Sequence, residues 1–313
     1  MPDLPYNDLN TNLRKRFGCR VHKITVDAGL TCPNRDGTAG TGGCIYCNAR
    51  GSGTGTSAHA SITEQLTSVQ PFMRKRYDAE KFIAYFQSFS NTYAPVEKLQ
   101  SMFVEALAVK DVVGLAIGTR PDCVGDDVLD LLAELNEKTY LTVEYGLQSI
   151  HDHTLEFINR GHASAVFRDA VKRTRSRGID ITVHVILGLP GENKNDMLST
   201  AKALADMDIQ GIKFHLLYVI RGTELHRMFR DGSYRCLSRD EYADILCDFI
   251  GYLPPGIILH RLIVDPHGNE LVAPEWSKEK AINLNVLHDA FEKRNIWQGK
   301  YYNSKQITVK EEE

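Results

Sequence analysis

The feature that most constrains the fold is a regular alternation of strand-like and helix-like segments along most of the 313-residue chain. Short apolar, β-branched runs are separated by stretches with the three-to-four-residue periodicity of amphipathic helices. The strand-like runs occupy residues 21–28, 81–88, 112–119, 140–149, 179–192, 211–220 and 256–265. The helix-like stretches occupy residues 61–77, 95–109, 126–138, 162–178, 195–208 and 238–253. This alternation indicates parallel βαβ units and predicts an α/β protein.

The residues that end the strands favour a barrel over a doubly wound sheet. Nearly every predicted strand finishes in polar or glycine residues, and a ring of functional groups at strand C-termini is typical of the active face of a (β/α) barrel. We therefore predict a partial (β/α) TIM-like barrel of about six to seven parallel strands. The barrel spans residues 21–265, with a short N-terminal extension, 1–20, and a C-terminal extension, 266–313.

Composition argues against several classes of protein. The net charge is −3, so no global basic field points to nucleic acid, although local basic stretches remain. The first ten residues lack the pattern of a signal peptide, and no apolar run approaches the ~18 residues of a membrane span. We expect a cytoplasmic protein with no membrane partner. An odd count of seven cysteines argues against a disulfide framework.

Three of the cysteines, Cys32, Cys44 and Cys47, lie within sixteen residues, in a glycine-rich loop after the first predicted strand. Thiolates are the preferred ligands of iron–sulfur clusters and of zinc. A structural zinc requires a fourth ligand, whereas three ligands on a four-iron cluster leave one iron open for chemistry. The residues alone leave two alternatives: zinc completed by His22 or His59, and a redox pair formed by the last two cysteines.

The cysteine loop and the motifs after it resemble the radical S-adenosylmethionine (SAM) superfamily. Members commonly carry Cys-x-x-x-Cys-x-aromatic-Cys after the first barrel strand. Here Tyr46 is the aromatic residue, but eleven residues separate Cys32 from Cys44, which resembles the subgroup of the elongator catalytic subunit. Over residues 6–300 the chain is similar to the YhcC/YtqA-type bacterial proteins. The similar motifs are AGLTCPNRDGTAGTGGCIYCNARGSG, GTRPDC, VEYGLQS, INRGH, HVILGLPGE and KFHLLYVIRGT.

The resemblance implies a 4Fe–4S cluster held by Cys32, Cys44 and Cys47, with SAM as the second cofactor. In such enzymes the open iron chelates the amino and carboxylate groups of SAM. The reduced cluster then cleaves SAM to a 5′-deoxyadenosyl radical, which abstracts hydrogen from the substrate. The cofactor supplies this chemistry and the protein positions it. A flavodoxin- or ferredoxin-type protein is the expected electron donor.

The resemblance also implies cofactor contacts at strand ends. Gln87 and Ser88 lie where the family contacts the methionyl amine, although the glycine-glycine-glutamate of many members is absent. Thr119 and Arg120 end the third strand, where a guanidinium suits a carboxylate, or else forms a structural salt bridge. Arg160 matches an arginine that contacts the methionyl carboxylate in coproporphyrinogen-dehydrogenase-like members. Its alternative is a solvated arginine at a helix end.

Strand alternation places more polar side chains on shared faces. Glu144 and Gln148 point the same way, and a buried glutamate is costly unless it is paired. The resemblance gives both residues a cofactor-contact role. His184 lies where the family places a ribose-contacting polar residue, although a single histidine in a strand is more often part of the core. Lys213 and His215 also share a face.

Together with Arg261 on the last strand, Lys213 and His215 are the candidate catalytic residues, in contact with the substrate or with the adenine side of SAM. Structural roles for all three remain an equal alternative.

Three hypotheses cover the function. The first is tRNA modification at a wobble uridine, by analogy with elongator, supported by basic stretches at residues 14–16, 74–76 and 172–177. Solvated helix ends are the alternative explanation of these stretches. The chain is too short for elongator's acetyltransferase domain, so its tRNA chemistry must differ or use a partner. The second is a radical reaction on a small molecule such as a porphyrin-like metabolite. The third is a non-catalytic zinc- or cluster-binding interaction protein.

Overall fold

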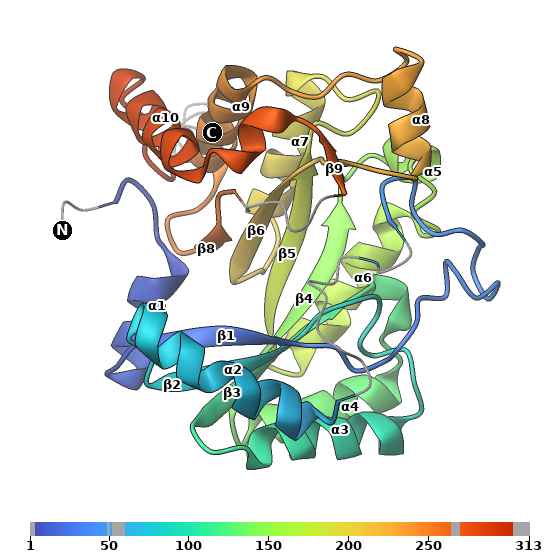
Figure 1. Cartoon of the computed structure of the whole chain (residues 1–313), viewed down its shortest axis with the longest axis vertical. Helices are drawn as coiled ribbons and strands as arrows, with labels where there is room; N and C mark the ends of the chain where they lie inside the picture. The colour runs from blue at the N-terminus through green and yellow to red at the C-terminus, as the bar shows by residue number, and fades with distance from the viewer. Residues whose placement is uncertain (1–3, 49–50, 52–59, 264–269, 303–313) are drawn as a thin grey trace, which may run out of the picture.

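The computed structural model describes residues 4–48, 51, 60–263 and 270–302. Its main element is a seven-stranded sheet in the order β1-β2-β3-β4-β5-β6-β8, in which every neighbouring pair is parallel. The strands are β1 (Val21–Val26), β2 (Lys81–Phe86), β3 (Val112–Thr119), β4 (Tyr140–Gln148), β5 (Asp180–Leu187), β6 (Gly211–Leu216) and β8 (Ile258–Arg261). Figure 1 shows the sheet curling from β1 round to β8. The predicted partial barrel is confirmed.

Helices connect successive strands and cover the outer face of the sheet (Figure 1). They are α2 (Ile62–Tyr77), α3 (Val96–Ala108), α4 (Asp126–Asn136), α6 (Ser164–Ser176), α7 (Lys194–Ala205) and α9 (Arg239–Tyr252). Three of them begin in a capping box, in which the N-cap side chain and the carboxylate three residues later each accept a hydrogen bond from the other's backbone amide. The pairs are Ser61 with Glu64, Asn193 with Asp196 and, as the sequence predicts, Ser238 with Glu241.

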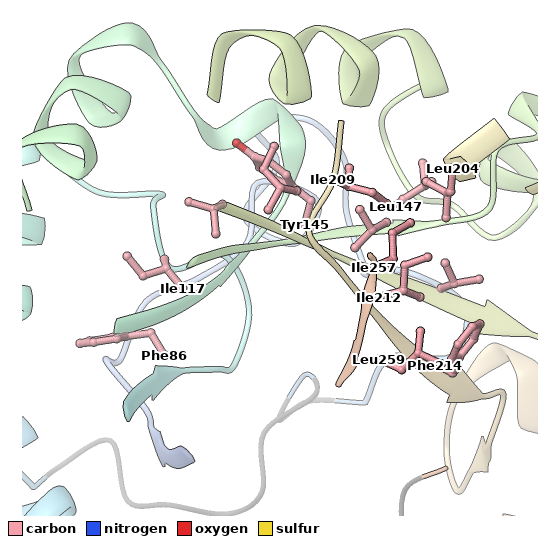
Figure 2. Close-up of a cluster of buried hydrophobic side chains, with 14 of the residues drawn as sticks. Phe86, Ile117, Tyr145, Leu147, Leu204, Ile209, Ile212, Phe214, Ile257 and Leu259 are labelled. Carbon is pink, nitrogen blue, oxygen red and sulfur yellow. The ribbon is translucent and has the colours of Figure 1, made fainter. Parts of the chain in front are cut away.

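The hydrophobic core lies between the sheet and these helices. Alternate residues of β4, Val143, Tyr145 and Leu147, point into it and are fully buried. Figure 2 shows how side chains from β2 to β8, among them Phe86 and Phe214, form one continuous cluster. Because this face takes the apolar residues, the opposite face of the same strands is left to polar side chains, which point into the barrel.

The N-terminal extension contains a helix that the sequence analysis did not predict, α1 (Leu9–Phe17). Asp8 caps it, and the backbone of Asp8 pairs with Leu259 of β8. Its apolar residues Leu9, Leu13 and Phe17 pack against β1, β2 and β3. Their four-residue spacing is a helical signal, which the basic residues between them obscured. The N-terminal segment thus contacts both ends of the sheet, β8 through Asp8 and β1 to β3 through α1.

The predicted strand 211–220 is interrupted. The chain leaves the barrel after β6, and β7 (Val219–Ile220) pairs antiparallel with β9 (Leu271–Ala273) in a second, two-stranded sheet. A pairing across some fifty residues leaves no local pattern in the sequence. The remaining elements are α5 (Asp152–Phe157), α8 (Glu224–Arg230), α10 (Lys280–Lys293), and short 3₁₀ helices at Pro121–Cys123 and Glu275–Lys278. Among the described helices, none has the length and apolar character needed to span a bilayer.

Candidate active site

One cavity of about 720 Å³, open mouth included, lies at the C-terminal ends of the barrel strands. All three clustered cysteines line it, as do all eight residues predicted to contact SAM. These are Cys32, Cys44, Cys47, Gln87, Ser88, Thr119, Arg120, Glu144, Gln148, Arg160 and His184. The structure therefore brings together residues from the cysteine loop and from the ends of four strands. This placement is what the sequence predicted for the active face.

The cysteine loop is held in shape by its own backbone and by the segment after β4. The amide of Arg35 donates to the carbonyl of Cys32 at 2.8 Å, and that of Cys47 to the carbonyl of Cys44 at 2.9 Å. The amide of Ile45 donates to the carbonyl of Ile158 at 3.1 Å. Burial, followed by the charge of Cys44, raises the pKa of the Cys47 thiol to about 11. The thiolate form therefore requires positive charge nearby.

Three arginines supply positive charge, and each faces a different cysteine. The guanidinium nitrogens lie 3.6 Å from sulfur for Arg35 and Cys47, 3.8 Å for Arg160 and Cys44, and 4.0 Å for Arg120 and Cys32. Arg120 is also clamped by both carboxylate oxygens of Asp122, at 2.8 and 2.6 Å. In the described part of the chain, neither Arg35 nor Arg160 forms an ion pair with a carboxylate.

Arg160 approaches the cysteines across Gly146. Its guanidinium donates to the Gly146 carbonyl and is buried, with 7% of the residue exposed. A Cβ atom at Gly146 would lie 2.6 Å from the guanidinium, so any larger residue there would displace it. This explains the glycine within the VEYGLQS segment. The Nε atom of Arg160 is buried and finds no hydrogen-bond partner in the described residues.

Other groups at the cavity wall are equally unsatisfied. The side-chain oxygens of Ser88 and Gln148 are buried without a hydrogen-bond partner among the described residues. Both residues also have a positive φ angle, 122° for Ser88 and 78° for Gln148, and this backbone conformation is strained for residues other than glycine. Orphaned polar atoms and strained backbone beside three thiols are features of a site built for a ligand. They fit a SAM molecule, whose amine, carboxylate and ribose offer both donors and acceptors.

Glu144 is fully buried at the inner end of the cavity and holds three partners. It forms ion pairs with Lys23 and with Lys213, the latter at 3.1 Å, and it accepts a hydrogen bond from His184 at 2.7 Å. Burial alone would raise the pKa of Glu144, but the charges of Lys213 and Lys23 and the bond from His184 hold it well below its usual range. The glutamate is therefore paired, and the pairing offsets the free-energy cost of burying its charge.

The three predicted catalytic residues lie behind the cavity wall. Lys213 donates to the hydroxyl of Tyr85 at 2.8 Å. The nitrogens of His215 and His184 are 3.1 Å apart, and Arg261 lies 3.0 Å from the Nδ1 of His215. None of the three lines the cavity directly, but Tyr85 and His184 do. They form a second layer, deeper in the barrel.

Sequence reasoning missed several groups that the structure places here. Lys23, Tyr85 and His260 point into the barrel beside Glu144, and Arg35 reaches Cys47. The alternation of β1 could have indicated Lys23, and the position of Arg35 inside the cysteine loop could have indicated its role. Asn34, which donates to the Asn159 carbonyl at 2.5 Å, depends on a contact across 125 residues and left no local signal.

Of the two fourth ligands proposed for zinc, the structure describes only His22. His22 stacks on Tyr77 with ring centroids 4.6 Å apart, on β1, and does not line the cavity. His59 lies outside the described residues.

A partial barrel with a three-cysteine loop after its first strand is the architecture of radical SAM enzymes. Family models agree: that of the radical SAM superfamily matches residues 35–204, and that of the Radical_SAM C-terminal domain matches residues 209–293. The chain belongs to the radical SAM superfamily. It is therefore an enzyme whose cofactors are a 4Fe–4S cluster and SAM, which overturns the hypothesis of a non-catalytic interaction protein.

Individual proteins resemble the chain over different shares of its length. YtqA of Bacillus subtilis is 44% identical over 299 residues, covering 95% of this chain and 92% of that protein. A tRNA uridine(34) acetyltransferase of Methanocaldococcus jannaschii is 28% identical over 153 residues, covering 48% of this chain and 28% of that protein. The structure of Elp3 from Methanocaldococcus infernus superposes with a TM-score of 0.64 at 18% identity, covering 89% of this chain and 64% of that one. At that identity the likeness concerns the fold.

Proposed function

We propose that this enzyme binds its 4Fe–4S cluster through Cys32, Cys44 and Cys47. When bound and reduced, the cluster supplies an electron that splits SAM into methionine and a 5′-deoxyadenosyl radical, which takes a hydrogen atom from the substrate. The observation that carries the proposal is the meeting of three thiols, three guanidinium groups and several orphaned polar atoms at one cavity. Each arginine offsets the negative charge of the thiolate that it faces.

Different cavity residues bind different parts of SAM. The unpaired Nε of Arg160 is the donor for the methionyl carboxylate, because a buried guanidinium without a carboxylate prefers an anionic partner. The orphaned oxygens of Gln148 and Ser88 are acceptors for the methionyl amine and a ribose hydroxyl. His184 closes the inner side and keeps the ribose against the barrel interior. Burial, followed by the charge of Lys213, lowers the pKa of His184 to about 4, so it acts as a neutral ring.

The test is the anaerobic formation of 5′-deoxyadenosine and methionine from SAM by the reconstituted protein with a chemical reductant. A flavodoxin- or ferredoxin-type donor should replace the reductant. We expect equal amounts of the two products. A protein that carries iron and sulfide but yields neither product refutes the proposal.

The first substrate to test is a tRNA uridine. Support comes from the similarity to the tRNA uridine(34) acetyltransferase, which extends over 153 residues, 48% of this chain. The basic stretch 172–177 adds no support, because its arginines are paired with acids of the chain itself. Arg173 bonds Asp169, Arg175 bonds Asp208 and Arg177 bonds Asp130.

Nucleosides of tRNA from a deletion strain should be compared by mass spectrometry with those of the parent strain. A modified uridine that disappears, and returns with the wild-type gene but not with a Cys47→Ala gene, supports a tRNA substrate. Identical nucleoside profiles in the two strains exclude it.

The second substrate class is a small acidic molecule, such as a porphyrin-like metabolite. One specific observation favours it: the described side chains inside the barrel, next to the cofactor cavity, carry more positive than negative charge.

A further inference from the structure

Seven side chains form a connected group inside the barrel, which we call the inner cluster. They come from five strands and lie on the polar faces of the sheet. Its members are Lys23, Glu144, His184, Lys213, His215, His260 and Arg261. The site described above uses only Glu144 and His184 of this group, at its outer edge.

Hydrogen bonds of the inner cluster form one chain, in which each group donates to the next from Arg261 to Glu144. Arg261 can only donate, and its Nη2 lies 3.0 Å from the Nδ1 and 3.3 Å from the Nε2 of His215. The nearer Nδ1 is taken as the acceptor, which leaves Nε2 to carry the proton. The Nε2 of His215 then donates to the Nδ1 of His184 at 3.1 Å, and the Nε2 of His184 donates to Glu144 at 2.7 Å. In this order each imidazole accepts at one nitrogen and donates at the other. Both rings are therefore neutral.

The charges of the inner cluster do not balance. Lys23, Lys213 and Arg261 are cations, and the histidines are neutral. Within the described residues, the carboxylate that forms ion pairs with this group is Glu144, which is already shared by the two lysines. Arg261 forms no ion pair with any described carboxylate, and its nearest polar partner is the neutral His215. With Lys213 protonated, the described side chains of this cluster thus carry an excess of two positive charges.

An excess of buried positive charge is unfavourable unless an anion offsets it. The state of Lys213 reflects this. Burial and the charges of Arg261 and Lys23, opposed by Glu144, lower the pKa of Lys213 to about 7. Tyr85 also faces the amine, with its hydroxyl 2.8 Å away. A second anion beside these groups would restore the protonated form.

Water reaches the inner cluster, so a ligand group has a route to it. Lys23 and His184 keep 15% and 14% of their side-chain surface exposed although both point into the barrel. His184, Glu144 and Tyr85 belong at the same time to the wall of the cysteine-lined cavity. A molecule whose polar end reaches Lys213 and Arg261 would therefore border the cysteine-lined cavity, which would hold SAM.

We propose that the inner cluster binds an anionic group, a carboxylate or a phosphate, of the small-molecule substrate or co-substrate, with Arg261 and Lys213 as its principal ligands. The inference rests on the proposed function, since it places this group beside the radical. It implies that the substrate is an acid whose charged end is buried deeper than the hydrogen atom that is removed.

Direct binding of two simple anions tests the inner cluster. The probes are sulfate, which stands in for a phosphate and keeps its charge between pH 6 and 8.5, and acetate, which stands in for a carboxylate. Each is titrated calorimetrically into the reconstituted protein with SAM bound, so that Arg160 is already engaged, at constant ionic strength set with chloride. The two arms separate a phosphate-bearing from a carboxylate-bearing substrate.

We expect saturable binding of one probe at a single site at pH 6, weakening at least tenfold in Arg261→Gln and less in Arg261→Lys. The matched control is Arg177→Gln, whose arginine pairs with Asp130 and Asp126 on the surface. Its affinity should equal that of the wild type. Binding should also weaken from pH 6 to 8.5 as Lys213 loses its proton. This pH series decides the question on the wild type alone if Arg261→Gln fails to fold.

The inner anion site is overturned if neither probe saturates, or if wild type and Arg261→Gln bind the probe with equal affinity. The proposed function fails separately. If the anion binds as expected but no 5′-deoxyadenosine forms, the radical chemistry is refuted and the binding site stands.

Discussion

Replacing Arg160 by glutamine should lower the reduction potential of the cluster. The guanidinium lies 3.8 Å from the Cys44 sulfur and is buried without a carboxylate among the described residues, so its full charge acts on the cluster site. Reduction adds one negative charge there, which a nearby cation stabilises. A unit charge at about 4 Å contributes roughly 4 kcal/mol at an effective dielectric constant of about 20.

That energy corresponds to about 170 mV for a one-electron couple, at 59 mV for each 1.36 kcal/mol. The added electron is spread over the cluster and lies on average farther from the guanidinium than the sulfur does. We therefore expect a fall of roughly 100 mV in Arg160→Gln. Arg160→Lys keeps the charge and should shift the potential by less than about half as much.

The assay is a redox titration of the reconstituted protein without SAM, followed by the electron paramagnetic resonance signal of the reduced cluster. Asp122→Asn is the control of opposite sign. Burial alone would raise the pKa of Asp122, but the hydrogen bonds and charge of Arg120 lower it, so the carboxylate is ionised and offsets that arginine. Its removal should raise the potential. A potential in Arg160→Gln that is unchanged or higher, with iron content intact, refutes this electrostatic account.

Three further predictions concern the barrel. Gly146→Ala should lower the free energy of unfolding in urea by about 1–3 kcal/mol, because the new methyl group meets Arg160 at 2.6 Å and Gln148 at 2.9 Å; an unchanged midpoint would show that the guanidinium moves freely. Phe103→Ala should cost about 3–5 kcal/mol, because Phe103 is fully buried edge-to-face on Phe86 at 5.0 Å; a loss below about 1 kcal/mol would contradict the core described here. The pKa of Lys213 is about 7 in the folded protein and near 10.4 in the unfolded chain. Between these pH values the unfolded chain binds more protons than the folded protein, so the free energy of unfolding rises with pH. The unfolding free energy of wild type minus that of Lys213→Met should thus rise by about 1 kcal/mol per pH unit from pH 7 to 9, and a flat or falling difference would exclude the lowered pKa.

The parts of the site that the sequence predicted are those fixed by local order along the chain. Ser88, Thr119 and Gln148 directly end or follow strands, and parallel strands bring their C-terminal ends to one edge. The cysteine loop follows the first strand for the same reason. Alternation within strands also placed Lys213 and His215 on the inner face, together with Glu144 of a different strand.

The parts that the sequence could not predict depend on contacts between distant segments. The pairing of Arg160 with Cys44 needs the segment after β4 to fold over the cysteine loop, 116 residues away. The acids that neutralise Arg175 and Arg177 come from other loops and helices, so the sequence alone gave no sign that these arginines are paired. The charge excess around Arg261 likewise appears only when five strands are brought together.

The most direct test of the central claim is the iron content of single cysteine variants after anaerobic reconstitution. Wild type should hold about four irons per chain, absorb near ~400 nm and show a reduced-cluster resonance that changes when SAM is added to the open iron. Cys32→Ala, Cys44→Ala and Cys47→Ala should each lose the intact cluster and 5′-deoxyadenosine formation, while Cys247→Ala, which removes a fully buried core thiol, should keep both. A colourless zinc protein, or a Cys44→Ala variant that retains four irons and its activity, would contradict the account.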